Sequence, residues 1–177
     1  MRITTAHTAE LSRRELAPAR ALLEDVFAGT FEPADWEHAL GGIHALAWEE
    51  DGELIGHASV VQRRLLHAGR ALRAGYVEGV GVRADRQRRG VAGGLMGALE
   101  RVIRGAYDVG ALGATDRAVR LYTARGWRAW TGPLSALTPD GVLPTPEEAG
   151  AIYVLPVGAD LDLAGELTCD WRDGGVW

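Results

Sequence analysis

The segment from Val80 to Ala92 constrains this chain more than any other part of the sequence. An apolar strand pattern ends at Val82, a basic turn containing Gly90 follows, and a helical pattern begins at once. The first backbone N–H groups of a helix have no partner within the helix, and the helix dipole places positive charge at the same end. We therefore predict a site for a phosphate or pyrophosphate group at this turn.

Length and composition favour one ordinary globular domain, residues 1–177, with 47% hydrophobic and 24% charged residues. No apolar stretch is long enough to span a membrane, and residues 1–5 lack the apolar core of a signal peptide. Cys169 is the only cysteine, so we expect no intrachain disulfide and no cysteine-based metal site. These features predict a cytoplasmic protein that binds neither membrane nor nucleic acid. The net charge of −5 fits a cationic small-molecule partner, or it simply aids solubility.

Hydrophobic periodicity predicts the element order β-α-α-β-β-β-α-β-α-β-β. The expected strands cover residues 3–11, 43–49, 54–66, 71–82, 109–114, 127–130 and 152–155, and the expected helices cover 12–28, a segment opened by Pro33 and ended by Gly41, a segment from Gly90 onward, and 117–125. The three consecutive strands between 43 and 82 have tight connections and should be antiparallel. The predicted fold class is therefore α/β, of a three-layer α+β kind, with a mixed sheet flanked by helices.

Capping residues and prolines set the expected helix ends. Ser12 and Glu15 have the form of a capping box, which places a helix start at Ser12. Pro18 lies too deep for a first turn, so the regular helix starts either at Ser12 or at Pro18. Asp116 is expected to cap the helix over 117–125, and residues 139–150 are expected to form a loop.

Three segments together resemble one superfamily. Gln87-Arg88-Arg89-Gly90-Val91-Ala92 matches the pattern Q/R-x-x-G-x-G/A, and the residues from Ala118 to Trp127 match A-x-x-L-Y-x-x-x-G-F/W. With the strand that carries Val80 and Val82, these segments resemble the GNAT superfamily of acyl-CoA-dependent N-acetyltransferases. The resemblance implies the GNAT fold, with a mixed, mostly antiparallel sheet, and acetyl-CoA as acyl donor.

Further segments narrow the resemblance. Residues 35–38, 75–80, 169–172 and 176–177 are similar to the aminoglycoside 2′-N-acetyltransferases of actinobacteria. The likeness implies acetyl transfer to the 2′-amino group of aminoglycoside antibiotics, and a homodimer. Two alternatives stay open: a GNAT enzyme that acts on another amine, such as a peptide N-terminus or a polyamine, and a non-catalytic acyl-CoA-binding module.

Acetyl transfer to an amine needs a proton acceptor, a group that stabilises the oxyanion, and a proton donor for the leaving thiolate. Glu78, in a partly apolar strand beside Gly79, is the predicted base, acting directly or through one water. The N–H of Val80 is expected to bond the thioester oxygen. The resemblance implies that Tyr122 is the general acid and that the C-terminal carboxylate of Trp177 accepts hydrogen bonds from a substrate ammonium.

The remaining predicted contacts fall into two sets. For the cofactor, the N–H groups of Gln87, Arg88, Arg89, Gly90, Val91 and Ala92 are expected to hold the pyrophosphate, while Val80, Gly81 and Val82 pair with the pantetheine amides. For the aminoglycoside, a polycation, the expected residues are Thr30, Asp35, Glu78, Gly79, Gly113, Glu148 and Trp177. The relatives are expected to carry acids at the positions of Thr30 and Gly175, so this chain should either bind cations more weakly or prefer a different substrate. The five histidines lack ligand spacing, so we predict no metal.

Overall fold

The computed structural model describes residues 1–177, which form two compact units. Unit 1 comprises residues 1–61 and 77–102, and unit 2 comprises residues 62–76 and 103–177. The strands are β1 (Arg2–His7), β2 (Ile43–Trp48), β3 (Leu54–His67), β4 (Arg70–Val82), β5 (Val109–Gly113), β6 (Arg128–Ala129), β7 (Leu134–Thr138), β8 (Gly141–Pro144), β9 (Ile152–Pro156) and β10 (Leu167–Cys169). The helices are α1 (Arg13–Val26), α2 (Pro33–Ala39), α3 (Val91–Ala106) and α4 (Val119–Thr123), with 3₁₀ helices η1 (Thr8–Glu10), η2 (Ala84–Arg86) and η3 (Pro146–Glu148).

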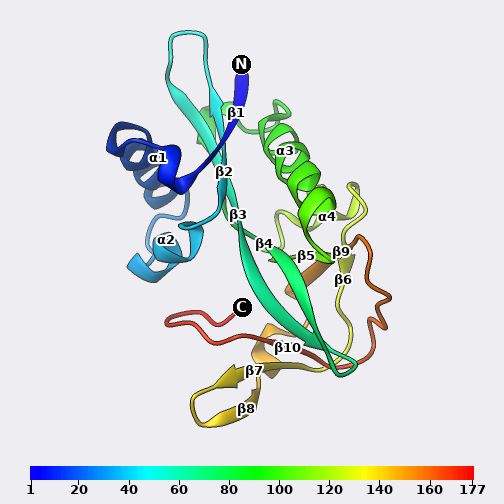
Figure 1. Ribbon diagram of the computed structural model, residues 1–177. Coiled ribbons are helices and arrows are strands. Elements are labelled where there is room, and N and C mark those ends of the chain that lie inside the picture. The colour runs from blue at the N-terminus through cyan, green and yellow to red at the C-terminus, as the bar shows by residue number, and fades with distance from the viewer. The chain divides into compact units, whose positions relative to one another are not determined.

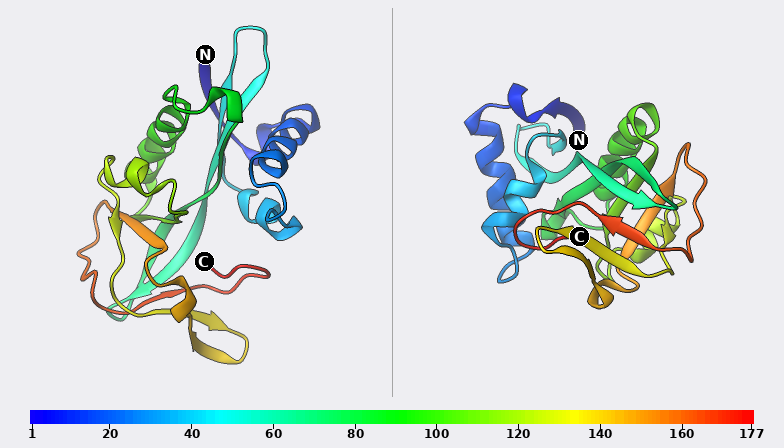
Figure 2. Two further views of the ribbon diagram at one scale, coloured as in Figure 1. Left: turned by 180° about the vertical axis from the view of Figure 1, so that it is seen from behind. Right: turned by 60° about the horizontal axis from the view of Figure 1, so that its bottom comes forward.

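In unit 1, helices cover both faces of the sheet. Strands β1 and β2 pair antiparallel, and β2 pairs antiparallel with β3, as the tight connections predict. Helices α1 and α2 lie on one side of these strands and α3 lies on the other (Figures 1 and 2). The three-layer arrangement predicted from the sequence is therefore confirmed in this unit.

Glycines allow the helices of unit 1 to approach the strands closely. A Cβ added at Gly81 of β4 would lie 2.7 Å from Leu23 of α1. On the other face, a Cβ at Gly56 of β3 would lie 3.0 Å from Val91 of α3. Contacts under about 3 Å exclude any larger side chain unless a neighbour shifts, so β4 is bound tightly to α1 and β3 to α3.

In unit 2, the strands pair in two groups. The start of β4 pairs in parallel with β5, and β9 lies between β5 and β6 with antiparallel pairing. The end of β3 pairs antiparallel with β10, which in turn pairs in parallel with β7. Strands β7 and β8 form a hairpin that Figure 1 shows beside β10. The ladders connect all ten strands into a mixed, mostly antiparallel sheet, as predicted.

Four predictions about individual elements are wrong. The first strand ends at His7 and not at residue 11, because His7 and Glu10 cap each other across η1: Glu10 accepts the His7 N–H at 2.7 Å and the His7 ring accepts the Ala9 N–H at 3.1 Å. Of the two starts left open for α1, the one at Ser12 is confirmed. The helix starts at Arg13 after the Ser12–Glu15 capping box, and Pro18 lies on its exposed face, where water can solvate the carbonyl that loses its partner.

The other three corrections concern the second half of the chain. Ala118, and not Asp116, is the N-cap of α4, which is shorter than predicted. Residues 139–150 are not one loop: they contain β8 and η3, and β7 precedes them. Strand β10 was also not predicted, so residues 152–155 are not the last strand. These strands are three to five residues long and are stabilised by pairing with distant segments, which local periodicity does not reveal.

Candidate active site

The predicted phosphate turn joins β4 to α3 within unit 1. Its backbone turns sharply at Arg88, with φ of +60°, and at Gly90, with φ of +82°. Gly94 N donates to Gly90 O at 2.9 Å, which is the first hydrogen bond of α3. The N–H groups of Val91 and Ala92 therefore lie at the open N-terminal end of a 16-residue helix. This end can bind a phosphate through its N–H groups and its dipole.

Most of the arginine charge near this turn is already paired. The ion pairs join Arg83 to Glu53 and to Asp85 (2.6 Å), and Arg86 to Glu49 (2.7 Å) and to Asp85 (2.6 Å). Arg88 and Arg89 are exposed and take part in none of these pairs. They are therefore the two cations that the turn can offer to an anionic cofactor.

Reversing these two charges should weaken cofactor binding specifically. In an Arg88→Glu, Arg89→Glu double variant, we expect the KM for acetyl-CoA to rise about 10- to 100-fold at low salt, and less at high salt because exposed charges are screened. Steady-state kinetics at two ionic strengths measures this. Arg86→Gln is the control, since Arg86 is already neutralised by its partners, and its KM should stay near that of the wild type. An equal rise of this KM in both variants would contradict the assignment of Arg88 and Arg89 to cofactor binding.

The strand that leads into the turn has one open edge. The ladder between β4 and β5 covers Ala74–Tyr76 and ends there. From Val77 to Val82, β4 has β3 as its only strand neighbour. Gly79, in the middle of this stretch, has φ of +55°, a conformation that interrupts a regular strand. An open edge next to a phosphate turn is the arrangement that the predicted pairing with pantetheine amides requires.

A small hollow in unit 1 brings together four of the predicted substrate residues. It has a volume of about 160 Å³ and is lined by Phe27, Thr30, Phe31, Asp35, Glu78 and Gly79. The two phenylalanine rings are stacked with their centroids 6.3 Å apart. A hollow lined by two carboxylates and two aromatic rings suits a cationic group such as an ammonium. Phe31 was not predicted, because it lies between two helices in a segment without periodicity.

Two polar side chains of this hollow already have partners. The Thr30 hydroxyl donates to the carbonyl oxygen of Phe27 at 3.0 Å. One oxygen of Asp35 accepts the N–H of Glu32 at 2.8 Å, which caps the first turn of α2. Asp35, the third residue of α2, is therefore held in place by capping its own helix. Glu78 is the half-buried carboxylate of this hollow that the cap does not involve.

Two buried histidines are connected by hydrogen bonds to Gly79, one of the residues that line this hollow. His44 and His57 are both 0% exposed, and His57 Nδ1 donates to the carbonyl oxygen of Gly79 at 2.8 Å. Burial is the main cause that lowers the pKa of each imidazole from 6.5 to about 4. The structure contains no group of three or more His, Cys, Asp or Glu residues arranged to hold a metal.

The lowered pKa values predict a loss of stability in mild acid. The folded state favours the neutral form of this histidine. Its contribution to the free energy of unfolding is therefore complete above pH 6.5 and decreases as the pH falls toward about 4. Between pH 7 and pH 4.5 we expect the free energy of unfolding to fall by about 2–3 kcal/mol from one such imidazole. Urea unfolding at both pH values measures the change. His57→Leu should lose part of this pH dependence, and an unchanged dependence would contradict the prediction.

In unit 2, Tyr122, the predicted general acid, is 4% exposed on α4. Its ring centroid lies 6.1 Å from that of Trp127. Burial raises the pKa of Tyr122 to about 12, so the phenol keeps its proton at neutral pH. A thiol has an ordinary pKa of about 8.5, so complete proton transfer from this phenol to a thiolate is uphill. Tyr122 is therefore better suited to stabilise a thiolate by donating a hydrogen bond.

Trp177 is anchored through both its side chain and its main chain. It is 9% exposed, and its indole Nε1 donates to the hydroxyl oxygen of Thr145 at 2.8 Å. Its main-chain oxygen accepts from Arg172 Nη2 at 2.6 Å. The predicted acceptor for a substrate ammonium is thus already bonded to an arginine. Arg63, 4% exposed, fixes the same segment, since its Nη2 donates to Val176 O at 2.6 Å. Neither arginine was predicted.

The other two predicted substrate residues also lie in unit 2. Gly113 is exposed at the end of β5, and a Cβ added there would lie 3.9 Å from the Tyr76 hydroxyl oxygen. Glu148 ends η3 and is half-buried. Burial first, and the neighbouring Glu147 carboxylate second, raise the pKa of Glu148. Burial therefore disfavours the charged form of Glu148, and a nearby cation would favour it.

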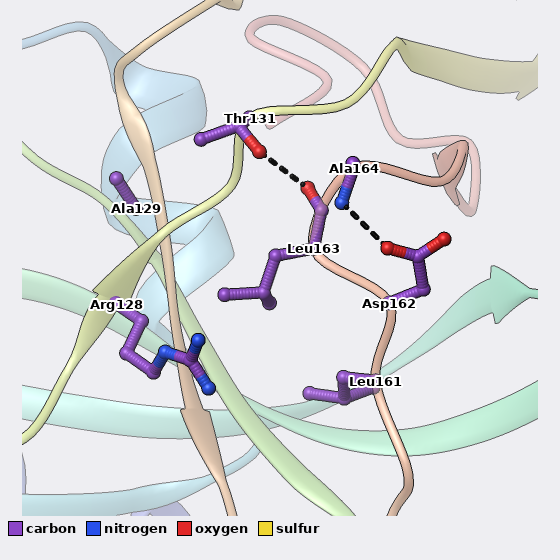
Figure 3. A pocket seen from close by; sticks show the side chains of 7 residues that line it. All are labelled: Arg128, Ala129, Thr131, Leu161, Asp162, Leu163 and Ala164. Carbon is purple, nitrogen blue, oxygen red and sulfur yellow. Dashed lines mark hydrogen bonds between the residues drawn. The ribbon is translucent and has the colours of Figure 1, made fainter.

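The larger hollow of unit 2 contains none of the predicted residues. It has a volume of about 570 Å³ and is lined by Arg128, Ala129, Thr131 and Leu161–Ala164 (Figure 3). Figure 3 shows that its polar groups bond mostly within the wall: Thr131 donates to Leu163 O at 2.9 Å, and Ala164 N donates to Asp162 at 3.0 Å. Size alone therefore does not mark the active site.

None of the helices has the length and apolarity that crossing a membrane requires.

Comparison with known proteins agrees with the fold. The acetyltransferase (GNAT) domain family matches residues 7–130, most of the chain, and these residues include parts of both units. The chain belongs to the GNAT family of acetyltransferases. An aminoglycoside 2′-N-acetyltransferase from Mycolicibacterium fortuitum is 51% identical over 175 residues, which cover 97% of this chain and 89% of that protein. Within the GNAT family, the chain therefore belongs with the aminoglycoside 2′-N-acetyltransferases.

Solved structures share the fold at low sequence identity. Eis1 from Mycobacterium abscessus has a TM-score of 0.62 at 22% identity over 76% of this chain, which spans only 33% of the length of that chain. A GNAT family acetyltransferase from Brucella melitensis, solved in complex with acetyl-CoA, has a TM-score of 0.61 at 18% identity over 94% of both chains. At these identities the likeness establishes the fold alone.

Proposed function

We propose that this protein transfers the acetyl group of acetyl-CoA to the 2′-amino group of aminoglycosides. The observation that carries the proposal is the 51% identity, over 97% of the chain, to a protein named for that activity. The phosphate turn with its two unpaired arginines suits acetyl-CoA, and the hollow that holds Asp35 and Glu78 suits an amino sugar. Because the family match includes parts of both units, we also propose that residues 1–177 act as one catalytic domain.

The proposed reaction assigns steps to Glu78, Val80 and Tyr122. Glu78 accepts a proton from the substrate ammonium, directly or through one water, and the freed amine nitrogen attacks the thioester carbonyl carbon. The N–H of Val80 stabilises the oxyanion. The C–S bond then breaks, the nitrogen loses a second proton as the amide forms, and a proton passes through water to the CoA thiolate, which the Tyr122 hydroxyl stabilises with a hydrogen bond. Acetyl-CoA supplies the activated acyl group, and the residues of the chain bind, orient and move protons.

The test is a comparison of acceptors that differ at the 2′ position. Gentamicin and tobramycin carry a 2′-amine, whereas kanamycin A carries a 2′-hydroxyl. We expect turnover with the first two and none at the 2′ position of the third, with mass spectrometry of the product locating the acetyl group. Turnover confined to polyamines or peptide N-termini would favour the alternative of a GNAT enzyme that acts on another amine. Binding of acetyl-CoA without turnover on any amine would favour a binding module. The cytoplasmic location and the homodimer stay predictions.

A further inference from the structure

A chain of hydrogen bonds in unit 1 runs from the exposed Gly41 through the buried His44 and His57 to Gly79. Gly41 N donates to Thr8 Oγ1 at 2.8 Å, and Thr8 Oγ1 lies 2.8 Å from His44 Nε2. His44 Nδ1 lies 2.9 Å from His57 Nε2, and His57 Nδ1 lies 2.8 Å from Gly79 O. The chain thus connects the loop before β2 to the strand that carries the candidate base.

The end of this chain fixes the direction of every hydrogen bond in it. A carbonyl oxygen only accepts, so His57 carries its proton on Nδ1 and accepts at Nε2. His44 must then donate from Nδ1, and its Nε2 accepts from the Thr8 hydroxyl at 2.8 Å, whose other acceptor, Gly42 O, lies farther away at 3.3 Å. This assignment requires both imidazoles to be neutral, and their complete burial favours that form. Because the last acceptor is a carbonyl, the chain holds a group in place and does not carry protons to it.

The group it holds is the irregular part of β4. Side chains of β3 support two consecutive carbonyls there: His57 bonds Gly79 O, and the Ser59 hydroxyl lies 3.4 Å from Glu78 O. Gly79 has φ of +55°, which turns the backbone between Glu78 and Val80. The ring of Trp36 packs against both imidazoles, with centroids at 6.4 Å from His44 and 6.0 Å from His57. The two rings therefore have little freedom to move.

We propose that His57, fixed by His44 and Thr8, is a positioning residue that holds the Gly79 carbonyl and so sets the direction of the Glu78 carboxylate and of the Val80 N–H. This inference rests on the proposed function for its effect on catalysis. The hydrogen-bond chain itself is a property of the free protein. The two can therefore be tested separately.

The first experiment needs no substrate. In the free wild-type protein, ¹⁵N NMR of the imidazole rings should show both His44 and His57 neutral with the proton on Nδ1. In His57→Leu, the amide signals of Gly79 and Val80 should shift. In Thr8→Val, the imidazole signals of His44 should change. Thr8→Ser keeps the hydroxyl, so its spectrum should resemble that of the wild type. A proton on Nε2 of His57 in the wild type would overturn the proposal whatever the enzyme acetylates.

The second experiment measures catalysis in the same variants. In His57→Leu we expect kcat to fall about 10- to 100-fold, since small displacements of reacting groups have effects of this size, while the KM for acetyl-CoA stays within about threefold. His57→Asn, whose amide can still donate to Gly79 O, should recover most of the loss. The pH–rate profile should shift in His57→Leu and return in His57→Asn.

A purely structural role predicts a different result. In that case His57→Leu would lower the melting temperature, but kcat per folded molecule and the pH–rate profile would equal those of the wild type, and the positioning role would be rejected. If the wild type fails to acetylate any 2′-amino aminoglycoside, the proposed function fails. The NMR result, and kcat ratios with the amine that is accepted, then still decide on the positioning role.

Discussion

Replacing Glu78 by glutamine is expected to lower kcat about 100-fold or more, the range that loss of a general base produces. Glutamine has nearly the shape of glutamate but does not accept a proton, so the substrate amine must lose its proton to water. The half-buried side chain lies in the hollow beside Asp35, and the change removes one charge without opening a cavity. Steady-state kinetics with a 2′-amino aminoglycoside, over a range of pH values, measures the effect.

The neighbouring carboxylate provides the matched control. Asp35→Asn also removes one negative charge from the hollow, but one Asp35 oxygen is committed to the N–H of Glu32. We therefore expect Asp35→Asn to raise the KM for the aminoglycoside with little change in kcat, and Glu78→Gln to act mainly on kcat and to flatten the acid limb of its pH profile. If Glu78→Gln keeps the acid limb of the wild type, Glu78 is not the base.

Local signals in the sequence were sufficient for the elements that position the cofactor turn. The Ser12–Glu15 capping box and Pro33 set the starts of α1 and α2 as predicted, because a cap is formed by residues three or four positions apart. The helix after Gly90 follows its hydrophobic stripe, and Leu95 and Leu99 are completely buried. Turn and helix therefore follow from short-range chemistry.

The parts that the sequence did not predict depend on contacts between distant residues. Strand β10 has three residues and exists through pairing with β3 and β7, so no window around Leu167–Cys169 could reveal it. The bond from His57 to Gly79 joins positions on different strands, and no spacing in the sequence marks His57 as more than a core histidine. Thr30 and Asp35 were predicted by resemblance, but their bonds to Phe27 and Glu32 are visible only in three dimensions.

The backbone at Gly79 should tolerate no side chain. Gly79→Ala places a Cβ 2.9 Å from Leu23 Cδ1 and 3.4 Å from His57 Nδ1, at a φ of +55° that costs an L-residue about 1–2 kcal/mol. Relief of the forced contact adds about 1–3 kcal/mol of destabilisation, or it moves β4 away from α1. Because Glu78 and Val80 flank this residue, we expect kcat/KM to fall about 100-fold or more as the reacting groups are displaced.

Gly52→Ala separates strain from displacement. Gly52 has φ of +87° in the hairpin between β2 and β3, and an added Cβ would have no neighbour within 4 Å, so this variant carries the backbone cost alone. Urea unfolding should show a loss of about 1–2 kcal/mol for Gly52→Ala and a larger loss for Gly79→Ala. Only Gly79→Ala should lose activity per folded molecule. Equal activity in the two variants would mean that the positive φ at Gly79 serves the fold alone, and that the direction of Glu78 does not depend on it.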